Sequence, residues 1–327
     1  MSGFSRRVRH VLLWVAGGLL VATMIGGCRP GGTATPIPAS PAPLASPLQS
    51  PLPLPGLEGQ LLFHSNRAGS YDIYRLDLAT GEISQLTNAP ENEVEPAISP
   101  DGRQIVYGRA RLDWSGQDLY LMNVDGTDQR LLLSMDGIAT SPAWSPDGSQ
   151  IVFYVTQAGH FRIFVVSSDG GEPHQLIEGT LNDMMPAWSP DGTQIVFTSD
   201  RGGYADLYLA NADGSNLRRL TDSVADEWRA RWSPDGRTIV FQGNETGFWQ
   251  LYLLDVNSGE IEQLTEGDED SEMPFWSGDG RFIYYTRGTH GETERFGLYV
   301  LDLERRESHP LTMPVDASDR YPVWMGE

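Results

Sequence analysis

The chain contains no lysine, so all 23 of its cations are arginine, and 44 Asp and Glu outnumber them. The formal net charge of −21 argues against a nucleic-acid ligand, because phosphate binding needs a basic surface. One cysteine excludes an internal disulfide and a thiolate metal cluster. After residue 57 no stretch long enough for a core helix is evident, whereas 36 Gly and 22 Pro in the chain favour many turns. The composition predicts a globular protein that is rich in turns.

The first 27 residues have the character of an export signal. Three arginines within the first ten residues precede an uncharged, apolar stretch over 11–27, which is typical of a secretory signal. Cys28 follows one hydrophobic and two small residues at the end of that stretch. This resembles the lipobox of bacterial lipoproteins, which implies that Cys28 is lipidated and becomes the first residue of the mature chain. An uncleaved anchor is the alternative, and export by the twin-arginine route is a second possibility beside the general route.

Residues 28–57 predict an extended linker. They include nine prolines, and no charged residue lies between Arg29 and Glu58. Such a segment favours polyproline II and has no amphipathic period. We therefore expect a signal peptide over 1–27, a lipidated cysteine with a linker over 28–57, and a folded domain over 58–327. The domain is expected outside the cytoplasm, anchored to a bacterial membrane as a lipoprotein.

One motif recurs through the folded domain. Its fullest form, Pro-Ala-Trp-Ser-Pro-Asp-Gly, occupies 142–148, and related copies end at Gly102, Gly192, Gly236 and Gly280. These glycines are separated by 46, 44, 44 and 44 residues. A period of this size is typical of solenoids and propellers.

Each copy of the motif begins a unit of four predicted strands. Ser-Pro-Asp-Gly suits a hairpin turn, because Pro presets φ at the second position and Gly accepts the left-handed conformation. A β-rich run such as Ile195–Phe197 follows, then an alternating run such as Asp206–Ala210, and then a short strand ending as in Arg219–Thr221. The unit predicts four antiparallel strands, which is the content of a propeller blade.

The two ends of the domain complement each other. The chain enters at Gln60–Phe63 without a preceding copy of the motif, and it ends in Tyr321–Trp324, which has the sequence of a first strand. We therefore expect an all-β fold, a six-bladed β-propeller with four-stranded antiparallel blades. The C-terminal strand is expected to join blade one and to close the ring, because an unpaired inner strand would expose backbone donors and acceptors.

The repeats resemble those of the TolB-type β-propeller, also described as WD40-like Pro-Asp repeats, over nearly all of residues 58–327. The resemblance implies a six-bladed propeller. TolB itself carries an α/β domain before its propeller, and we expect this chain to lack it, because the linker leads directly into the first strand. Related propellers cap prolyl-oligopeptidase-like enzymes, which need an α/β-hydrolase domain with Gly-x-Ser-x-Gly; the sequence contains no such motif.

Most conspicuous residues are better explained by structure than by chemistry. The tryptophans at 144, 188, 232, 276 and 324 recur at one blade position, so we interpret them as packing between blades. The aspartates of Ser-Pro-Asp-Gly are interpreted as turn residues. The histidines fall at unrelated repeat positions and form no His-Glu-x-x-His motif. The acidic run over 266–272 lacks the spaced ligands of an EF-hand, which favours a solvated loop over a calcium site.

One set of positions has a pattern that suggests a binding site. The residue five places before the repeat tryptophan, or before Ile98, is acidic in four copies. Equivalent positions of a ring approach the same mouth of its central tunnel, so these carboxylates are expected to converge, to repel one another and to favour a cation or a basic partner group. Neighbouring aromatic and basic residues break the symmetry of the repeat. The candidate site consists of Glu93, Asp183, Glu227, Asp319, Trp228, Arg229, Arg320 and Tyr321.

Two classes of function follow from this reading. The first is a non-enzymatic, monomeric, envelope-anchored lipoprotein whose propeller binds a protein or peptide partner, with no catalytic residue and no cofactor. The second is an enzyme with its site at the tunnel mouth, a Ca²⁺-dependent propeller hydrolase. A further alternative with its site at the same mouth is a propeller that binds or cleaves polysaccharide. A bound metal is therefore an open question, and the absence of a catalytic motif favours the first class.

Overall fold

The computed structural model describes residues 57–326, apart from 114, 158, 180, 291–293 and 314–315. The predicted signal peptide, Cys28 and the linker up to residue 56 lie outside the described residues. Within the described part of the chain, no helix is long and apolar enough to cross a membrane. The described residues form 24 strands, which are grouped in five sheets.

Four of the sheets have four strands each. The first has the order β24 (Asp319–Trp324), β1 (Gln60–Ser65), β2 (Asp72–Asp77), β3 (Ile83–Gln85). The second has the order β12 (Asp183–Trp188), β13 (Gln194–Ser199), β14 (Asp206–Asn211), β15 (Arg218–Arg219). The third has the order β16 (Glu227–Trp232), β17 (Thr238–Gly243), β18 (Gln250–Asp255), β19 (Ile261–Gln263). The fourth has the order β20 (Asp270–Trp276), β21 (Phe282–Thr289), β22 (Arg295–Asp302), β23 (Glu307–Pro310).

The fifth sheet has eight strands in two antiparallel groups. One group is β4 (Glu93–Ile98), β5 (Gln104–Ala110), β6 (Gln117–Asn123) and β7 (Arg130–Leu133). The other group is β8 (Ile138–Trp144), β9 (Gln150–Gln157), β10 (His160–Ser167) and β11 (His174–Gln175). A single parallel pair, Gln117 with Ile138, joins the two groups.

The turn after each first strand shows why the repeated Ser-x-Asp-Gly sequence is needed. In the first copy, the Ser99 hydroxyl donates to Asp101 Oδ1 at 2.6 Å and accepts from the Gln104 backbone at 2.9 Å. Gly102 adopts φ 70°, where an L side chain would be strained, and its N–H donates to the Ser99 carbonyl at 2.9 Å. The same bonds recur in the other four copies. The interpretation of these aspartates as turn residues is confirmed.

Two of the repeated tryptophans donate a hydrogen bond to the preceding first strand, as expected for packing between blades. Trp144 Nε1 donates to the Ala97 carbonyl, and Trp276 Nε1 donates to the Arg231 carbonyl, each at 3.1 Å. Trp324 also explains an irregular copy of the motif, in which Gly278 replaces proline. A Cβ at Gly278 would lie 2.2 Å from the Trp324 ring, so only glycine leaves room for the indole.

The C-terminal strand pairs with the strand at which the described chain begins. β24 is antiparallel to β1, with Leu61 opposite Trp324 and Ser65 opposite Asp319. The pairing continues beyond the strand, since the Gln60 N–H donates to the Gly326 carbonyl at 3.2 Å. The first sheet therefore combines residues from both ends of the described chain.

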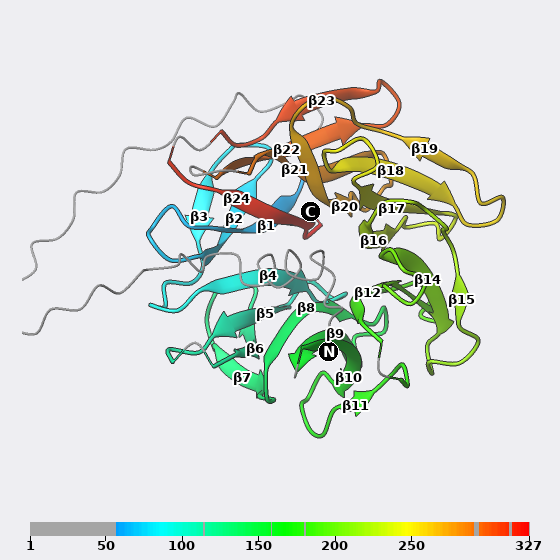
Figure 1. The fold of residues 1–327 in the computed structure, drawn as a ribbon. Coiled ribbons are helices and arrows are strands. Elements are labelled where there is room, and N and C mark those ends of the chain that lie inside the picture. Colours follow the sequence, from blue (N-terminus) through cyan, green and yellow to red (C-terminus); the bar gives the residue numbers. More distant parts are fainter. Residues whose placement is uncertain are drawn as a thin grey trace, which may run out of the picture. The chain divides into compact units, whose positions relative to one another are not determined.

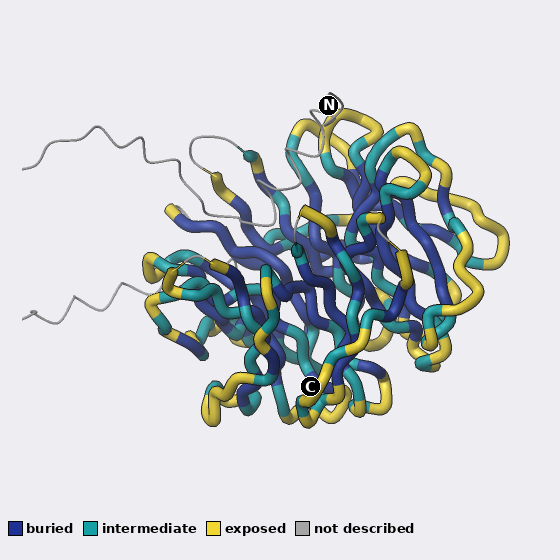
Figure 2. Tube along the Cα trace, turned by 60° about the horizontal axis from the view of Figure 1, so that its bottom comes forward, coloured by how far each residue is buried: buried dark blue, intermediate teal, exposed yellow. Residues whose placement is uncertain are grey.

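The sheets pack face to face through apolar clusters. In each of six cases a first strand contacts the second strand of the preceding group, as β12 contacts β9 and β24 contacts β21. One such core unites Val196 and Leu207 with Ile239 and Phe241 across two sheets. Figure 1 shows the first strands β4, β8, β12, β16, β20 and β24 nearest the centre, and Figure 2 shows buried strands with exposed loops at their ends. The fold is an all-β propeller with antiparallel four-stranded blades.

Candidate functional site

The first strands share a β-bulge at an equivalent position. In all six first strands, the residue three places before the tryptophan, or before Ile98, has a positive φ. The pairing with the second strand shifts register at the same place. Positive φ is uncommon for residues other than glycine, so its repetition marks a structural feature rather than a local defect. The six residues are Glu95, Ser141, Met185, Arg229, Met273 and Tyr321, with φ between 49° and 61°.

Three of these residues meet although they come from distant parts of the chain. Arg229 Nη2 donates to Glu95 Oε1 at 2.9 Å across 134 residues of sequence. The Arg229 guanidinium also lies over the Tyr321 ring, 5.1 Å from its centroid. Tyr321 Oη accepts from Arg231 Nη2 at 2.8 Å. Glu95, Arg229, Arg231 and Tyr321 are called the central cluster here; they belong to β4, β16 and β24.

Glu95 is the single carboxylate of the central cluster and is fully engaged. Its Oε2 accepts from the Thr140 hydroxyl at 2.5 Å, the Ser141 N–H at 2.7 Å and the Ser141 hydroxyl at 2.9 Å. Burial would raise the pKa of Glu95, but Arg229 and these hydrogen bonds bring it to about 2. Glu95 is therefore ionised throughout the neutral range, and the cluster holds two guanidinium groups against one carboxylate.

His64 supports the cluster from β1 in its neutral form. Its Nδ1 accepts from the Glu95 N–H at 3.1 Å, and its ring stacks on Tyr321 at 6.2 Å between centroids. Burial lowers the pKa of His64 to about 3, although Glu95 opposes the change. Because His64 is neutral near pH 7, it cannot act as an acid there. Its bond from the Glu95 N–H positions the bulge of β4.

A cavity of about 370 Å³ opens on the side of the Ser-x-Asp-Gly turns. Its walls come from the ends of β4, β8, β12, β16, β20 and β24 and the residues that follow them. Indole rings and prolines dominate the lining, which includes Trp144, Trp188, Trp232, Trp276, Trp324, Pro100, Pro146 and Pro190. We call this cavity the aromatic funnel.

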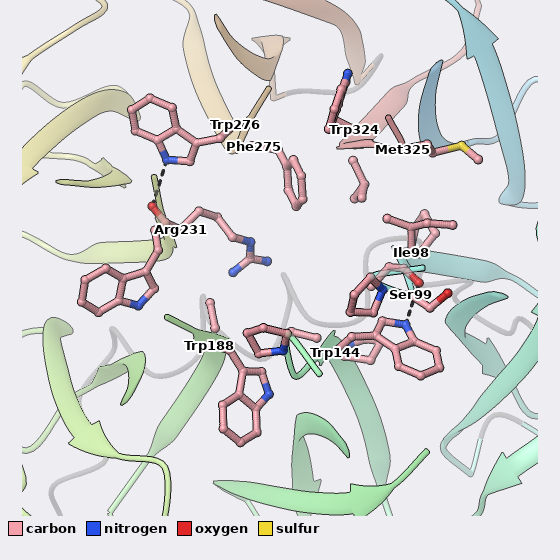
Figure 3. A pocket seen from close by; sticks show the side chains of 18 of the residues that line it. Ile98, Ser99, Trp144, Trp188, Arg231, Phe275, Trp276, Trp324 and Met325 are labelled. Carbon is pink, nitrogen blue, oxygen red and sulfur yellow. Dashed lines mark hydrogen bonds between the residues drawn. The ribbon is translucent and has the colours of Figure 1, made fainter. Parts of the chain in front are cut away.

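Arg231 is the one charged side chain in the described lining of the aromatic funnel. Figure 3 shows its guanidinium extending toward the middle of the cavity. The other copies of the motif place Ala, Phe or Val at this position. Besides its bond to Tyr321, Arg231 donates from Nη1 to the Ala230 carbonyl at 3.0 Å. The funnel thus presents one cation within an apolar wall, an arrangement suited to an anionic or hydrogen-bond-accepting group carried by an apolar ligand.

Three of the four carboxylates predicted to form a negative ring are neutralised within their own sheets. Glu93 pairs with Arg109 at 2.5 Å, Asp183 with Arg201 at 2.7 Å and Asp319 with Arg67 at 2.5 Å. All three carboxylate side chains are almost completely buried. The expectation of four uncompensated, mutually repelling charges is wrong for these three, because the second strand or the loop after it supplies an arginine to each.

Glu227 is the exception among the four. It is buried, and the Thr221 hydroxyl donates a short hydrogen bond to its Oε2. Burial raises the pKa of Glu227 to about 7; the bond from Thr221 opposes this change, whereas Asp206 and Glu245 add to it. No arginine pairs with it directly in the described part of the chain.

The four remaining predicted residues divide into two groups. Arg229 and Tyr321 meet in the central cluster, as described above. Trp228 instead packs on Trp249 at 4.6 Å between ring centroids. Arg320 lies over the Phe296 ring at 3.9 Å and pairs with Glu294 at 2.5 Å. Trp228 and Arg320 therefore have contacts on their own or the adjoining sheet and do not join the cluster.

Sequence reasoning overlooked Glu95 and Arg231. A signal existed for both, since each is a charged residue at a repeat position that is otherwise mostly uncharged. The predicted carboxylates lie two residues before the bulge, whereas Arg229 and Tyr321 of the predicted site lie at the bulge itself. Among the described residues, no group of His, Cys, Asp and Glu has the arrangement of a metal site.

Comparison with known proteins places the chain in one family. Residues 112–325 match the family model of the TolB beta propeller domain. The chain is 30% identical over 122 residues to the protein TolB homolog of Chlorobaculum tepidum, and 30% identical over 120 residues to the Tol-Pal system protein TolB of Francisella tularensis. Each match covers 37% of this chain and 27% of the relative, so only a part of these relatives corresponds to this chain.

Solved structures share the fold at low sequence identity. TolB from Acinetobacter baumannii aligns with a TM-score of 0.72 and 22% identity, over 82% of this chain and 67% of that one. Kuenenia stuttgartiensis hydrazine synthase aligns with a TM-score of 0.69 and 18% identity, over 83% and 47%. Oligogalacturonate lyase from Vibrio parahaemolyticus aligns with a TM-score of 0.55 and 19% identity, over 78% and 74%. At these identities the similarity concerns the fold alone.

Proposed function

Because the chain belongs to the TolB β-propeller family, we propose that it is an extracytoplasmic lipoprotein whose propeller binds a protein or peptide partner in the bacterial envelope and catalyses no reaction. The aromatic funnel is the observation that carries this proposal. Its volume of about 370 Å³ suits a few side chains of a partner, and tryptophan and arginine are the residues that contribute most at protein interfaces.

In this proposal the propeller has six blades. The eight-stranded sheet counts as two blades, since β4 and β8 each have their own bulge and their own Ser-Pro-Asp-Gly turn. Pairing of β24 with β1 then completes the first blade and closes the ring. A closed ring leaves no inner strand edge to pair with a second copy, which favours a monomer.

The partner site in this proposal is the aromatic funnel together with the central cluster beneath it. Tyr321 lines the funnel, and Arg229 contacts Tyr321 from the cluster. Arg231 supplies the charge that orients the partner. The buried ion pairs of Glu93, Asp183 and Asp319, and the packing of Trp228 and Arg320, support the opposite ends of the same strands.

The anchor is tested at the lone cysteine. Cys28→Ser removes the thiol to which the lipid would be attached, so incorporation of labelled fatty acid is expected to fall to background. Equal incorporation into the variant and the wild-type chain would contradict lipidation at this residue.

The partner site is tested by photo-crosslinking of the full chain in its native envelope. A photoreactive side chain at Met325, which lines the funnel, is expected to yield a discrete adduct. The matched control is Leu131, an apolar residue on the outer strand β7 that is 52% exposed. Arg231→Ala, which introduces the residue found in three other copies, is expected to weaken the adduct at position 325. Identical adducts at both positions, or none at position 325, would contradict a partner site in the funnel.

A further inference from the structure

Three sheets repeat one arrangement of an arginine, two aromatic rings and a carboxylate. Arg67 lies over Phe63 and Tyr74, at 5.3 and 4.9 Å from the ring centroids, and pairs with Asp319. Arg201 lies over Phe197 and Tyr208, at 5.8 and 5.1 Å, and pairs with Asp183. Arg109 lies over Tyr107 and Tyr120 and pairs with Glu93. In each sheet the carboxylate begins the first strand and the rings belong to the second and third strands.

The β16–β19 sheet has the rings and the carboxylate but a different residue in place of the arginine. Phe241 and Tyr252 stack at 5.5 Å between centroids, close to the 5.7 Å of Phe63 and Tyr74. Glu227 begins the first strand, as Asp319 and Asp183 do. Glu245 stands where the other sheets have Arg67 and Arg201. The positions are equivalent, since each lies in a turn closed by the same 3.0 Å backbone bond, such as Gly247 N–H to the Asn244 carbonyl.

A cavity of about 500 Å³ lies at this place in the β16–β19 sheet. Its lining includes the two rings, Glu227 and Glu245, with Asp222 beside them. Tyr252 is 7% exposed, and its hydroxyl has no hydrogen-bond partner among the described residues. A buried hydroxyl without a partner is costly, so it indicates a group that the cavity is built to receive.

We propose that this cavity binds the side chain of an arginine presented by a partner peptide, whose guanidinium takes the place that Arg67 and Arg201 hold in the other sheets. The planar guanidinium would lie over Phe241 and Tyr252, donate to the Glu227 carboxylate, and give the Tyr252 hydroxyl a donor. Glu245 at the cavity would attract the cation during its approach, whereas Asp222 is already paired with Arg219 at 2.7 Å.

An arginine fits this site better than a lysine or a metal ion. A guanidinium stacks on aromatic rings and bonds a carboxylate in one plane, whereas an ammonium is a compact and strongly hydrated charge. The equivalent sites in two other sheets already bury a guanidinium, because the Arg67 and Arg201 side chains are only 13% and 16% exposed. The inference rests on the proposed function only in requiring a peptide partner.

The test uses N-acetyl-L-arginine amide, which carries its single charge on the guanidinium, titrated into the full chain in detergent at pH 8. Saturation-transfer NMR is expected to show contact with the side-chain methylenes and guanidinium end of the probe. Glu227→Gln is expected to weaken binding at least about tenfold, because it removes the charged acceptor. N-acetyl-L-lysine amide is expected to bind several-fold more weakly than the arginine probe.

Glu245→Arg is the decisive variant, since it supplies from within the chain the arginine that stands at this position as Arg67 and Arg201 in two other sheets. It is expected to fold and to abolish binding of the probe. Glu82→Arg makes the same change of charge on the exposed β2–β3 turn and is expected to leave binding unchanged. If Glu245→Arg did not fold, Tyr252→Leu would keep the charge of the cavity and is expected to weaken binding through the lost ring.

Three outcomes would overturn the inference: no binding by the wild type, equal binding by the wild type and Glu245→Arg, or equal binding of the arginine and lysine probes. The last outcome would mean that the probe responds only to the overall charge of −21. The probe requires neither the funnel nor a partner. If the arginine probe did not bind but a discrete adduct formed at Met325, the proposed function would stand. If the probe bound but no adduct formed at Met325, only the partner site in the funnel would be refuted.

Discussion

Glu227→Gln is expected to stabilise the protein at neutral and alkaline pH but not at acidic pH. The pKa of this buried carboxyl rises from 4.5 to about 7 on folding, chiefly through burial; Asp206 and Glu245 add to the rise, whereas Thr221 and Arg219 oppose it. As pH increases, the unfolded chain therefore loses its proton first. The free energy of unfolding falls between about pH 4.5 and pH 7 and stays lower above that range.

The magnitude follows from the displacement of the pKa. At about 1.4 kcal/mol for each pH unit, a pKa raised from 4.5 to about 7 lowers the free energy of unfolding by about 3 kcal/mol at pH 8. Glutamine is uncharged and can still accept the bond from Thr221, so it removes most of this cost. For a domain of this size the gain corresponds to a melting temperature higher by roughly 6–10 °C at pH 8. At pH 4 both states are mostly protonated, and the variant should melt close to the wild-type temperature.

Calorimetry or circular dichroism melts of the wild type, Glu227→Gln and Glu93→Gln at pH 4, 6 and 8 would measure this effect. Glu93 begins β4 as Glu227 begins β16, but it pairs with Arg109 at 2.5 Å. The same substitution there leaves the arginine without its carboxylate and is expected to cost about 3–5 kcal/mol. A destabilised Glu227→Gln at pH 8, or a gain of equal size at pH 4, would refute the reasoning.

Three further changes test the centre and the closure of the fold. Arg229→Met leaves Glu95 buried without its cation and should cost about 3–5 kcal/mol in urea unfolding, and a second change of Glu95→Met should recover most of that loss. Gly278→Pro restores the repeat sequence but should lower the melting temperature, because the added atoms meet the Trp324 ring, a strain of about 1–3 kcal/mol. Removing 319–326 deletes the partner of β1 and should cost at least about 3–5 kcal/mol by the same urea measurement, so an unchanged midpoint would show that β24 contributes nothing.

Local chemistry explains why so much of the fold was predictable from the sequence. A Ser-Pro-Asp-Gly turn closes through bonds between residues at most five positions apart, so each copy specifies its own turn. Alternating apolar residues then define the strands on either side. Repetition gives the register of one unit against the next, which is how the contact of Trp144 with the preceding strand could be anticipated. The pairing of β24 with β1 followed from the same repetition.

Tertiary structure alone decided which side chains share the centre and which charges remain unpaired. Three of the residues that meet at the centre, Glu95, Arg229 and Tyr321, lie at the bulge of their first strands, and the period of the repeat contains no sign of that bulge. Glu95 meets Arg229 across 134 residues, a contact that depends on how whole sheets are placed around the axis. The presence of Glu245 where two other copies have arginine is visible in the sequence, but the empty guanidinium site that we propose to result from it is not. It becomes clear only when the guanidinium sites of the other sheets show what that position does, because a side chain acquires its role from neighbours that folding brings together.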